Sequence, residues 1–234
     1  MPEYRYIGKG LYTLYEAAAF TEVSWARVRH WVRGDLRTEL SKGRYRIPSI
    51  IKADFGKISG KWALSFMDLM EIRMIFALEG LGVSLHTIRN AHIAAIDLFK
   101  TKHPFIERLL WTDGKGIWVR IAENLFDVRF LEVIKRQYEL PKVTEMFLEK
   151  VDFESDYTIP IRFWPLKREK GIVIDPLRGF GQPITANEGV PTIALAKAVK
   201  AEGSFETVAK YFEVSEDLVK ESYFFELNYT RRAA

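Results

Sequence analysis

The pattern of apolar and polar positions is clearest at residues 13–33, where it predicts two short helices joined by a tight turn. Thr13 and Glu16 have the spacing of a capping box, which begins a helix, and Ser24 is a suitable N-cap for the next helix. At about 100° per residue, Trp25 and Trp31 fall on an apolar side that we expect to be core. The opposite, polar side consists of Ala26, Arg29, His30 and Arg33, with Arg27 at its edge. A helix of this kind can bury one side and lay the other against phosphates, so we predict a DNA-binding helix-turn-helix in which Ser24 opens the second helix.

The pattern continues with a basic hairpin and two longer helices. Residues 43–48 predict one strand of a hairpin that carries Arg44 and Arg46 beside the helix pair. We expect Arg27 and Arg29 to approach bases or phosphates, Arg33 and His30 to approach phosphates, and Arg44 and Arg46 to approach the minor groove or the backbone beside it. Ser65 is expected to cap a periodic helix at residues 66–79, and Ser84 to cap another that runs to Phe99. Residues 56–62 resemble a phosphate-binding loop, but the spacing is one residue short and a tryptophan replaces the magnesium-binding hydroxyl. We therefore expect no nucleotide site there.

The order helix, turn, helix, hairpin and two further helices resembles the DNA-binding domain of the MerR-like regulators. The matching residues are Val23-Ser24, Val28-Arg29-His30-Trp31, Asp68-Leu69 and Gly82-Val83-Ser84-Leu85 with Ile88. The resemblance covers residues 1–103 and implies a winged helix-turn-helix in which Arg29 and His30 contact phosphates. His30 and Trp31 stand where that family usually has tyrosines. The effector domain of the family is not recognisable, so the resemblance implies no inducer and no metal.

Residues 104–166 predict a small mixed connector, which we consider the candidate dimerisation region. A Gly-Lys-Gly turn precedes a predicted strand at residues 117–121, and residues 126–146 have helical apolar spacing. Two further strands are predicted at residues 158–166 and 171–176.

The end of the chain repeats the framework of its beginning. Helices are predicted at residues 191–198, 205–212 and 216–227, and the last two share the Glu-Val-Ser turn of the first pair. The polar face, however, consists of Asp217, Lys220, Glu221 and Phe224. Carboxylates repel phosphate, so we expect this face to bind a protein partner rather than DNA. Packing within its own domain is an equally weighted alternative for Phe224.

Residues 167–234 resemble the domain of unknown function family 433, a small helical module. The match lies in Ile174-Asp175-Pro176, Phe180-Gly181-Gln182-Pro183-Ile184, Gly189-Val190-Pro191-Thr192, Val208-Ala209, Phe212 and Val214-Ser215. Members of this family are often antitoxin partners of PIN-like ribonuclease toxins. The two resemblances together imply a VapB-type antitoxin: a homodimer that binds operator DNA, represses its own operon and neutralises a PIN-like ribonuclease. We expect Arg231 and Arg232, in a terminal tail, to reach the acidic active site of that toxin.

Composition sets the remaining limits. The chain has 234 residues, of which 48% are hydrophobic, and it contains no cysteine, so disulfides and thiolate metal sites are excluded and a cytoplasmic location is expected. The net charge of +4 is mild, but bases outnumber acids in residues 1–62 whereas acids predominate in residues 201–229. This asymmetry predicts different partners for the two ends.

The sequence offers little support for catalysis. The four histidines show no i,i+4 pair and no accompanying carboxylate motif, so we expect them on the surface or in packing rather than as metal ligands. No nucleophile elbow is present. We therefore predict a non-enzymatic, mostly helical α+β protein without cofactor or metal. Two alternatives remain open: a ligand-responsive MerR-like transcriptional regulator, and a protein-interaction adaptor that does not bind DNA.

Overall fold

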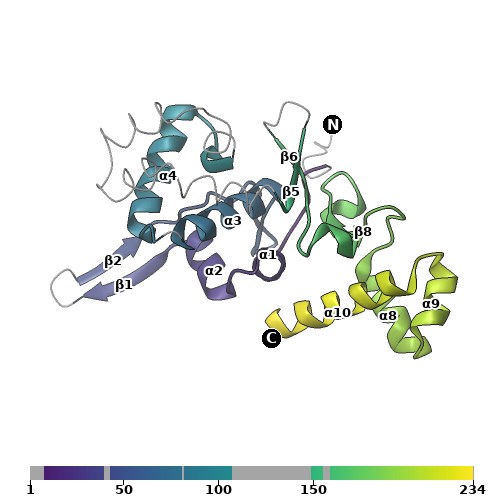
Figure 1. Cartoon of the computed structure of the whole chain (residues 1–234). Helices are drawn as coiled ribbons and strands as arrows, with labels where there is room; N and C mark the ends of the chain where they lie inside the picture. The colour runs from purple at the N-terminus through teal and green to yellow at the C-terminus, as the bar shows by residue number, and fades with distance from the viewer. Residues whose placement is uncertain (1–7, 40–42, 81, 107–148, 155–158, 234) are drawn as a thin grey trace.

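The structure, a computed structural model, describes residues 8–39, 43–80, 82–106, 149–154 and 159–233. Helices predominate over short antiparallel sheets in this part of the chain, which confirms the predicted α+β class (Figure 1). The N-terminal elements are α1 (Leu14–Thr21), α2 (Trp25–Arg33), β1 (Asp35–Glu39), β2 (Gly43–Ile47), β3 (Gly56–Ile58), β4 (Lys61–Ala63), α3 (Phe66–Gly80) and α4 (Leu85–Phe99). The C-terminal elements are β5 (Val151–Phe153), β6 (Pro160–Phe163), η2 (Arg168–Lys170), β7 (Ile172–Ile174), η3 (Gly179–Gly181), β8 (Pro183–Thr185), α8 (Thr192–Glu202), α9 (Phe205–Phe212) and α10 (Glu216–Ala233). Among the helices described, none combines the length and apolar character needed to cross a membrane.

Local signals in the sequence determine where the first two helices begin. The predicted capping box is present: the Thr13 amide donates to Glu16 Oε2 at 2.7 Å, and the Glu16 amide donates to Thr13 Oγ1 at 3.2 Å. Ser24 occupies the N-cap position of α2, and its carbonyl accepts from the Arg27 amide at 3.0 Å. Its hydroxyl makes no capping hydrogen bond to the helix, so Ser24 contributes to the start of α2 through its backbone.

The apolar side of α2 lies in the main core, as the helical periodicity predicts. Val28, Trp31 and Val32 are buried there, together with residues of α3 such as Leu69 and Met70. Phe163 from β6 and Ile174 from β7 belong to the same core. The sheet is therefore packed against the helices that precede it in the chain.

A four-stranded antiparallel sheet, in the order β5-β6-β7-β8, crosses the predicted boundary between residues 166 and 167. β6 and β7 agree with the strands predicted at residues 158–166 and 171–176. The strand predicted at 117–121 and the helix predicted at 126–146 lie outside the described residues. The described strands on either side of this boundary therefore belong to one sheet.

Two hairpins follow α2. β1 and β2 pair antiparallel from Asp35 opposite Ile47 to Glu39 opposite Gly43, as the basic hairpin prediction requires. Gly34 begins this hairpin with a φ of 71°, and a Cβ added there would lie 2.3 Å from the Ile47 carbonyl oxygen, so only glycine fits. β3 and β4 form the second hairpin across residues 56–63. The glycine-rich stretch at residues 56–62, which resembles a phosphate-binding loop, thus forms most of this hairpin, with Ser59 and Gly60 at the turn.

Three helices at the C-terminus pack around a second, smaller core. Leu195 from α8, Val208 from α9 and Val219 from α10 are buried together. α10 continues to Ala233, so the segment expected to form a terminal tail is helical. The far part of α10 returns to α1, where Phe20 stacks on Tyr229 with ring centroids 5.4 Å apart. In Figure 1 the β1–β2 hairpin and the α8–α10 module lie at opposite ends of the molecule.

Candidate nucleic-acid interface

A basic hollow lies where the end of α2 meets the β1–β2 hairpin. Its volume is about 350 Å³, and it is lined by Arg29, Arg33, Gly34, Asp35, Leu36 and Arg46. Arg29 and Arg33 are one helical turn apart on α2, whereas Arg46 comes from β2, in register with Leu36 of β1. All three arginine side chains are exposed. The structure thus brings together three of the predicted DNA-binding residues, from two elements, around one open concavity.

One carboxylate, that of Asp35, lies in this hollow and is itself surrounded by donors. The Leu36 amide donates to Asp35 Oδ1 at 2.9 Å, and Arg37 and His30 lie 3.5 and 3.7 Å from Oδ2. The hydrogen bond from the Leu36 amide, followed by the nearby His30 and Arg37 side chains, lowers the pKa of Asp35. Asp35 therefore helps to order the start of the hairpin. Among the residues that line the hollow, the three arginines outnumber this one carboxylate.

Arg29 is positioned by an aromatic stack that begins on α1. Its guanidinium lies 5.5 Å from the centre of the Trp25 ring, and Trp25 in turn stacks on Tyr15 at 5.3 Å with 16° between the planes. Trp25 is half-buried and packs against the main core, as expected, but it also presents a face to Arg29. Helical periodicity alone predicts only the buried role of Trp25, although its i,i+4 spacing from Arg29 on a helix indicates such a contact.

Arg27 points away from the hollow and toward α3. It forms an ion pair with Glu79, and its guanidinium lies 5.2 Å from the Trp31 ring centre and 4.9 Å from that of Phe76. In the structure Arg27 thus forms a contact between two helices, whereas the DNA contact expected of it stays a prediction. The sequence could not show this, because Arg27 and Glu79 are 52 positions apart.

We expect Arg27→Met to lower the free energy of unfolding by about 1 kcal/mol, because an ion pair and two cation–π contacts are lost. Arg33→Met is the matched control: the same charge is removed from the same helix at an exposed site, and the expected effect is below about 0.5 kcal/mol. Urea denaturation followed by circular dichroism measures both. Equal effects of the two substitutions would contradict the assignment of Arg27 to the contact with α3.

His30 is half-buried behind the hollow. Its Nδ1 lies 3.7 Å from Asp35 Oδ2, and its Nε2 lies 3.4 Å from a guanidinium nitrogen of Arg89. Burial and the nearby charge of Arg89 lower the pKa of His30, which favours the neutral imidazole. A phosphate contact of His30 would therefore depend on hydrogen bonding rather than on charge. Arg44, the remaining predicted contact, is exposed on β2 opposite Thr38.

Two of the four histidines, His92 and His103, belong to buried clusters with carboxylates that no short sequence motif indicates. His92 Nε2 lies 2.8 Å from Glu71 Oε1, and neither side chain is exposed. His103 Nε2 lies 3.1 Å from Asp54 Oδ2 and its Nδ1 lies 4.0 Å from Asp68 Oδ1. The carboxylates are 21 to 49 positions away along the chain, so spacing rules for short motifs could not find them.

In the second of these clusters the pKa values of Asp54, Asp68 and His103 are shifted from their usual values. Burial disfavours the charged form of Asp54, but hydrogen bonds from His103 and Ser65 outweigh it and hold the Asp54 pKa well below its usual range. Burial raises the pKa of Asp68 to about 6. The His103 pKa is raised because its carboxylate neighbours outweigh the effect of burial.

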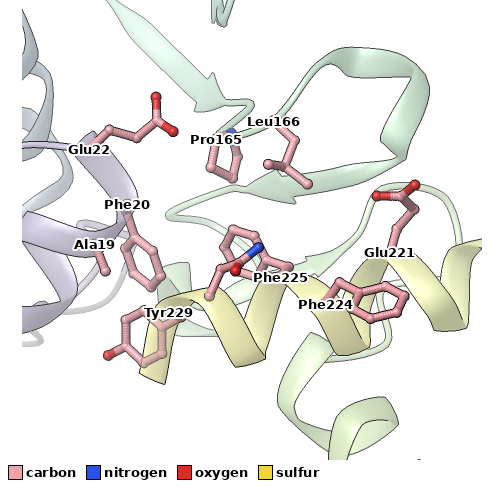
Figure 2. A pocket seen from close by; sticks show the side chains of 10 residues that line it. Ala19, Phe20, Glu22, Pro165, Leu166, Glu221, Phe224, Phe225 and Tyr229 are labelled. Atoms are coloured by element: carbon pink, nitrogen blue, oxygen red, sulfur yellow. The ribbon is translucent and has the colours of Figure 1, made fainter. Parts of the chain in front are cut away.

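A narrow groove separates α1 from α10 (Figure 2). It has a volume of about 140 Å³ and is lined by Ala19, Phe20, Glu22, Pro165, Leu166, Glu221, Phe224, Phe225, Asn228 and Tyr229. Glu221 forms an ion pair with Lys170, and Lys150 lies 3.8 Å from Glu22. α10 thus carries the predicted partner residues Glu221 and Phe224 beside the aromatic residues that contact α1.

The predicted partner face is partly exposed and partly packed. Phe224 is 54% exposed, yet its ring also contacts Tyr223 at 5.6 Å and Phe205 at 6.4 Å, so both alternatives for this residue have structural support. Lys220 lies 2.8 Å from Glu216 and 4.0 Å from the well-exposed Asp217. The side chains of Arg231 and Arg232 lie outside the described part of the structure.

Comparison with known proteins gives two similarities. No family model matches the chain. The sequence is 27% identical over 223 residues to a protein of Mycobacterium tuberculosis named "Putative antitoxin VapB45", covering 91% of this chain and 92% of that protein. The structure is similar to the crystal structure of Rv2018 from Mycobacterium tuberculosis, with a TM-score of 0.68 and 24% identity, over 92% of this chain and 98% of that chain. The second similarity shows a shared fold.

Proposed function

We propose that this chain is the antitoxin of a toxin–antitoxin pair and that it represses its own operon by binding operator DNA. The similarity to the mycobacterial protein supports the antitoxin role, because it extends over nearly the whole of both chains. The basic hollow of Arg29, Arg33 and Arg46 is the observation that carries the DNA-binding role. α1, α2 and the β1–β2 hairpin would act as a MerR-like winged helix-turn-helix.

In this proposal α2 enters the major groove and the hairpin follows the adjacent backbone. Arg29, Arg33 and Arg46 bind phosphates, which fix the position of the protein on the duplex. The exposed Ser24 at the start of α2 offers a hydroxyl and nearby backbone amides to a further phosphate. Arg44 contacts the backbone or the minor groove beside the hairpin. A homodimer would place two α2 helices about 34–36 Å apart, one turn of DNA.

The α8–α10 module would hold a PIN-like ribonuclease toxin at the opposite end of the molecule. Asp217, Lys220, Glu221 and Phe224 form the proposed contact. The partly exposed Phe224 ring among carboxylates suits an interface in which an aromatic side chain enters a pocket of the partner. Arg231 and Arg232, at the end of α10, would reach the acidic active site of the toxin.

The DNA-binding role is tested with the full chain and a labelled duplex from upstream of its own gene. We expect the logarithm of the binding constant to fall linearly with the logarithm of the salt concentration. The specific duplex should bind at least about a thousandfold more tightly than an unrelated duplex of equal length. Fluorescence anisotropy measures both quantities. Failure to bind the upstream duplex, with and without the neighbouring gene product, would favour the protein-interaction adaptor instead.

The partner surface is tested by Phe224→Ser. If the product of the neighbouring gene is a ribonuclease, we expect this substitution to weaken its inhibition by at least about tenfold, because an interface anchor is removed. Leu177→Ser is the matched control, since Leu177 is also an exposed apolar side chain but belongs to the turn before η3. Inhibition assays with a fluorogenic RNA measure the effect. Equal inhibition by wild type and Phe224→Ser would exclude Phe224 as an anchor.

A further inference from the structure

Three segments that are distant in the sequence bring ligand-type side chains to one buried place. Asp54 precedes β3, Asp68 belongs to the first turn of α3, and His103 follows α4. One ligand atom from each residue lies within 4.8 Å of the others. Asp68 is fully buried and His103 nearly so, whereas Asp54 is partly exposed and opens the cluster to solvent. The cluster is separate from the proposed DNA and partner surfaces.

Two buried polar atoms in this cluster are not matched by hydrogen bonds. One oxygen of Asp68, Oδ2, accepts from the amides of Asp54 at 3.0 Å and Ser65 at 2.8 Å. The other oxygen, Oδ1, has no hydrogen-bond partner among the described residues, and the same is true of His103 Nδ1. These two atoms face each other at 4.0 Å, which is too long for a hydrogen bond. A buried carboxylate oxygen without a donor is costly, so Asp68 Oδ1 is available to a cation bound in this cluster.

We propose that Asp54, Asp68 and His103 bind one divalent transition-metal ion of the zinc class. A nitrogen and oxygen donor set without thiolate suits such an ion. In a tetrahedral site, ligand atoms that each lie about 2.0–2.2 Å from the metal are about 3.3–3.6 Å apart. The ligand atoms of the three residues all lie within 4.8 Å of one another, so metal binding requires them to approach by at most about 1.5 Å. His103 binds as the neutral imidazole and releases its proton to solvent, and water completes the coordination.

Lys102 competes with the metal ion for Asp54, because its ammonium lies 3.3 Å from Asp54 Oδ1. That side chain is more than half exposed, so it can leave Asp54 for solvent when the metal binds. The bound ion restrains the segment between β2 and β3. In this segment the amides of Ile50 and Ile51 donate to the Trp31 carbonyl of α2, at 2.7 and 3.1 Å. Metal binding is therefore expected to slow hydrogen exchange at these two amides.

The test is calorimetric titration of the metal-free full chain with zinc chloride. We expect one ion per chain for the wild type. Asp54→Asn and Asp68→Asn should each weaken binding by more than the roughly 10- to 100-fold that loss of an outer-shell partner costs. His86→Gln is the control, because His86 is an exposed histidine whose ring faces Asn90 instead of this cluster. Circular dichroism verifies that each variant is folded.

Asp54→Asn keeps the inference testable even if Asp68→Asn fails to fold, because Asp54 is the exposed member of the cluster. Stoichiometric zinc binding that is lost in Asp54→Asn and retained in His86→Gln would support the site. Zinc binding that is absent in the wild type, equal in Asp54→Asn, or lost in His86→Gln would overturn it. None of these outcomes depends on DNA or on a toxin.

Discussion

Replacing Arg29, Arg33 and Arg46 together with alanine should make the salt dependence of operator binding shallower by about three units. Each guanidinium that neutralises a phosphate releases close to one condensed counterion, which contributes about 0.9 to the slope. At 0.1 M salt this corresponds to a loss of affinity of roughly 10²- to 10³-fold. The effect is expected to be large because the three side chains converge on one hollow instead of acting at separate points. Anisotropy titrations between 50 and 200 mM salt would measure it.

The control for this experiment removes the same number of charges elsewhere. Lys197, Lys200 and Lys210 are exposed on α8 and α9, at the other end of the molecule. Their combined replacement by alanine lowers the net charge equally, but we expect it to change the slope by less than about one unit. If both triple variants lose the same slope, then the protein binds DNA through its overall charge, and the hollow is not the site.

The parts of the fold that sequence analysis predicted correctly depend on neighbours in the sequence. The capping box at Thr13 and Glu16, the helices after Ser65 and Ser84, and the β1–β2 hairpin all agree with the structure. Each depends on interactions over a few positions, such as a side chain that accepts the amide three residues later. The exposure of Arg29 and Arg33 follows from helical periodicity in the same way.

The parts that were missed depend on contacts between distant segments. Arg27 belongs to the same helix as Arg29 and Arg33, but it lies about 200° around the helix axis from Arg29 and forms an ion pair with Glu79 of α3. The sheet that joins β5 and β6 to β7 and β8 likewise combines strands from both sides of the boundary expected between residues 166 and 167. The candidate metal site combines residues 54, 68 and 103, whose proximity only the tertiary structure reveals. Patterns within a single sequence do not predict contacts between residues that are far apart along the chain.

Within α3, helical periodicity likewise predicts only some of the buried residues. The apolar positions of this helix predicted a buried face, and Leu69, Met70, Met74 and Leu78 are buried. Asp68 and Glu71 are buried as well, although periodicity alone assigns charged residues to the surface. A buried carboxylate requires donors, and those of Glu71 come from α4 and from the chain after it.

Glu71→Ala should therefore lower the free energy of unfolding by about 3–5 kcal/mol. The carboxylate is fully buried, lies 2.8 Å from His92 Nε2, and accepts from the amides of Phe105 at 3.1 Å and Ile106 at 3.2 Å. Alanine removes the acceptor for all three groups and leaves a cavity. Glu71→Gln keeps the volume and one acceptor oxygen, so we expect a smaller loss of about 1–3 kcal/mol. Chemical denaturation of each variant measures these differences.

The matched control is Glu206→Ala, which removes an exposed carboxylate that lies 2.7 Å from Lys210, one turn along α9. Such a pair contributes about 0.3–0.5 kcal/mol, so the expected order of destabilisation is Glu71→Ala, then Glu71→Gln, then Glu206→Ala. A loss for Glu71→Ala no greater than that for Glu206→Ala would contradict the buried network. The order also separates two causes of destabilisation. A loss of unfolding free energy confined to Glu71→Ala reflects the cavity. A substantial loss in Glu71→Gln reflects the hydrogen bonds that connect α3 with α4 and the chain after it.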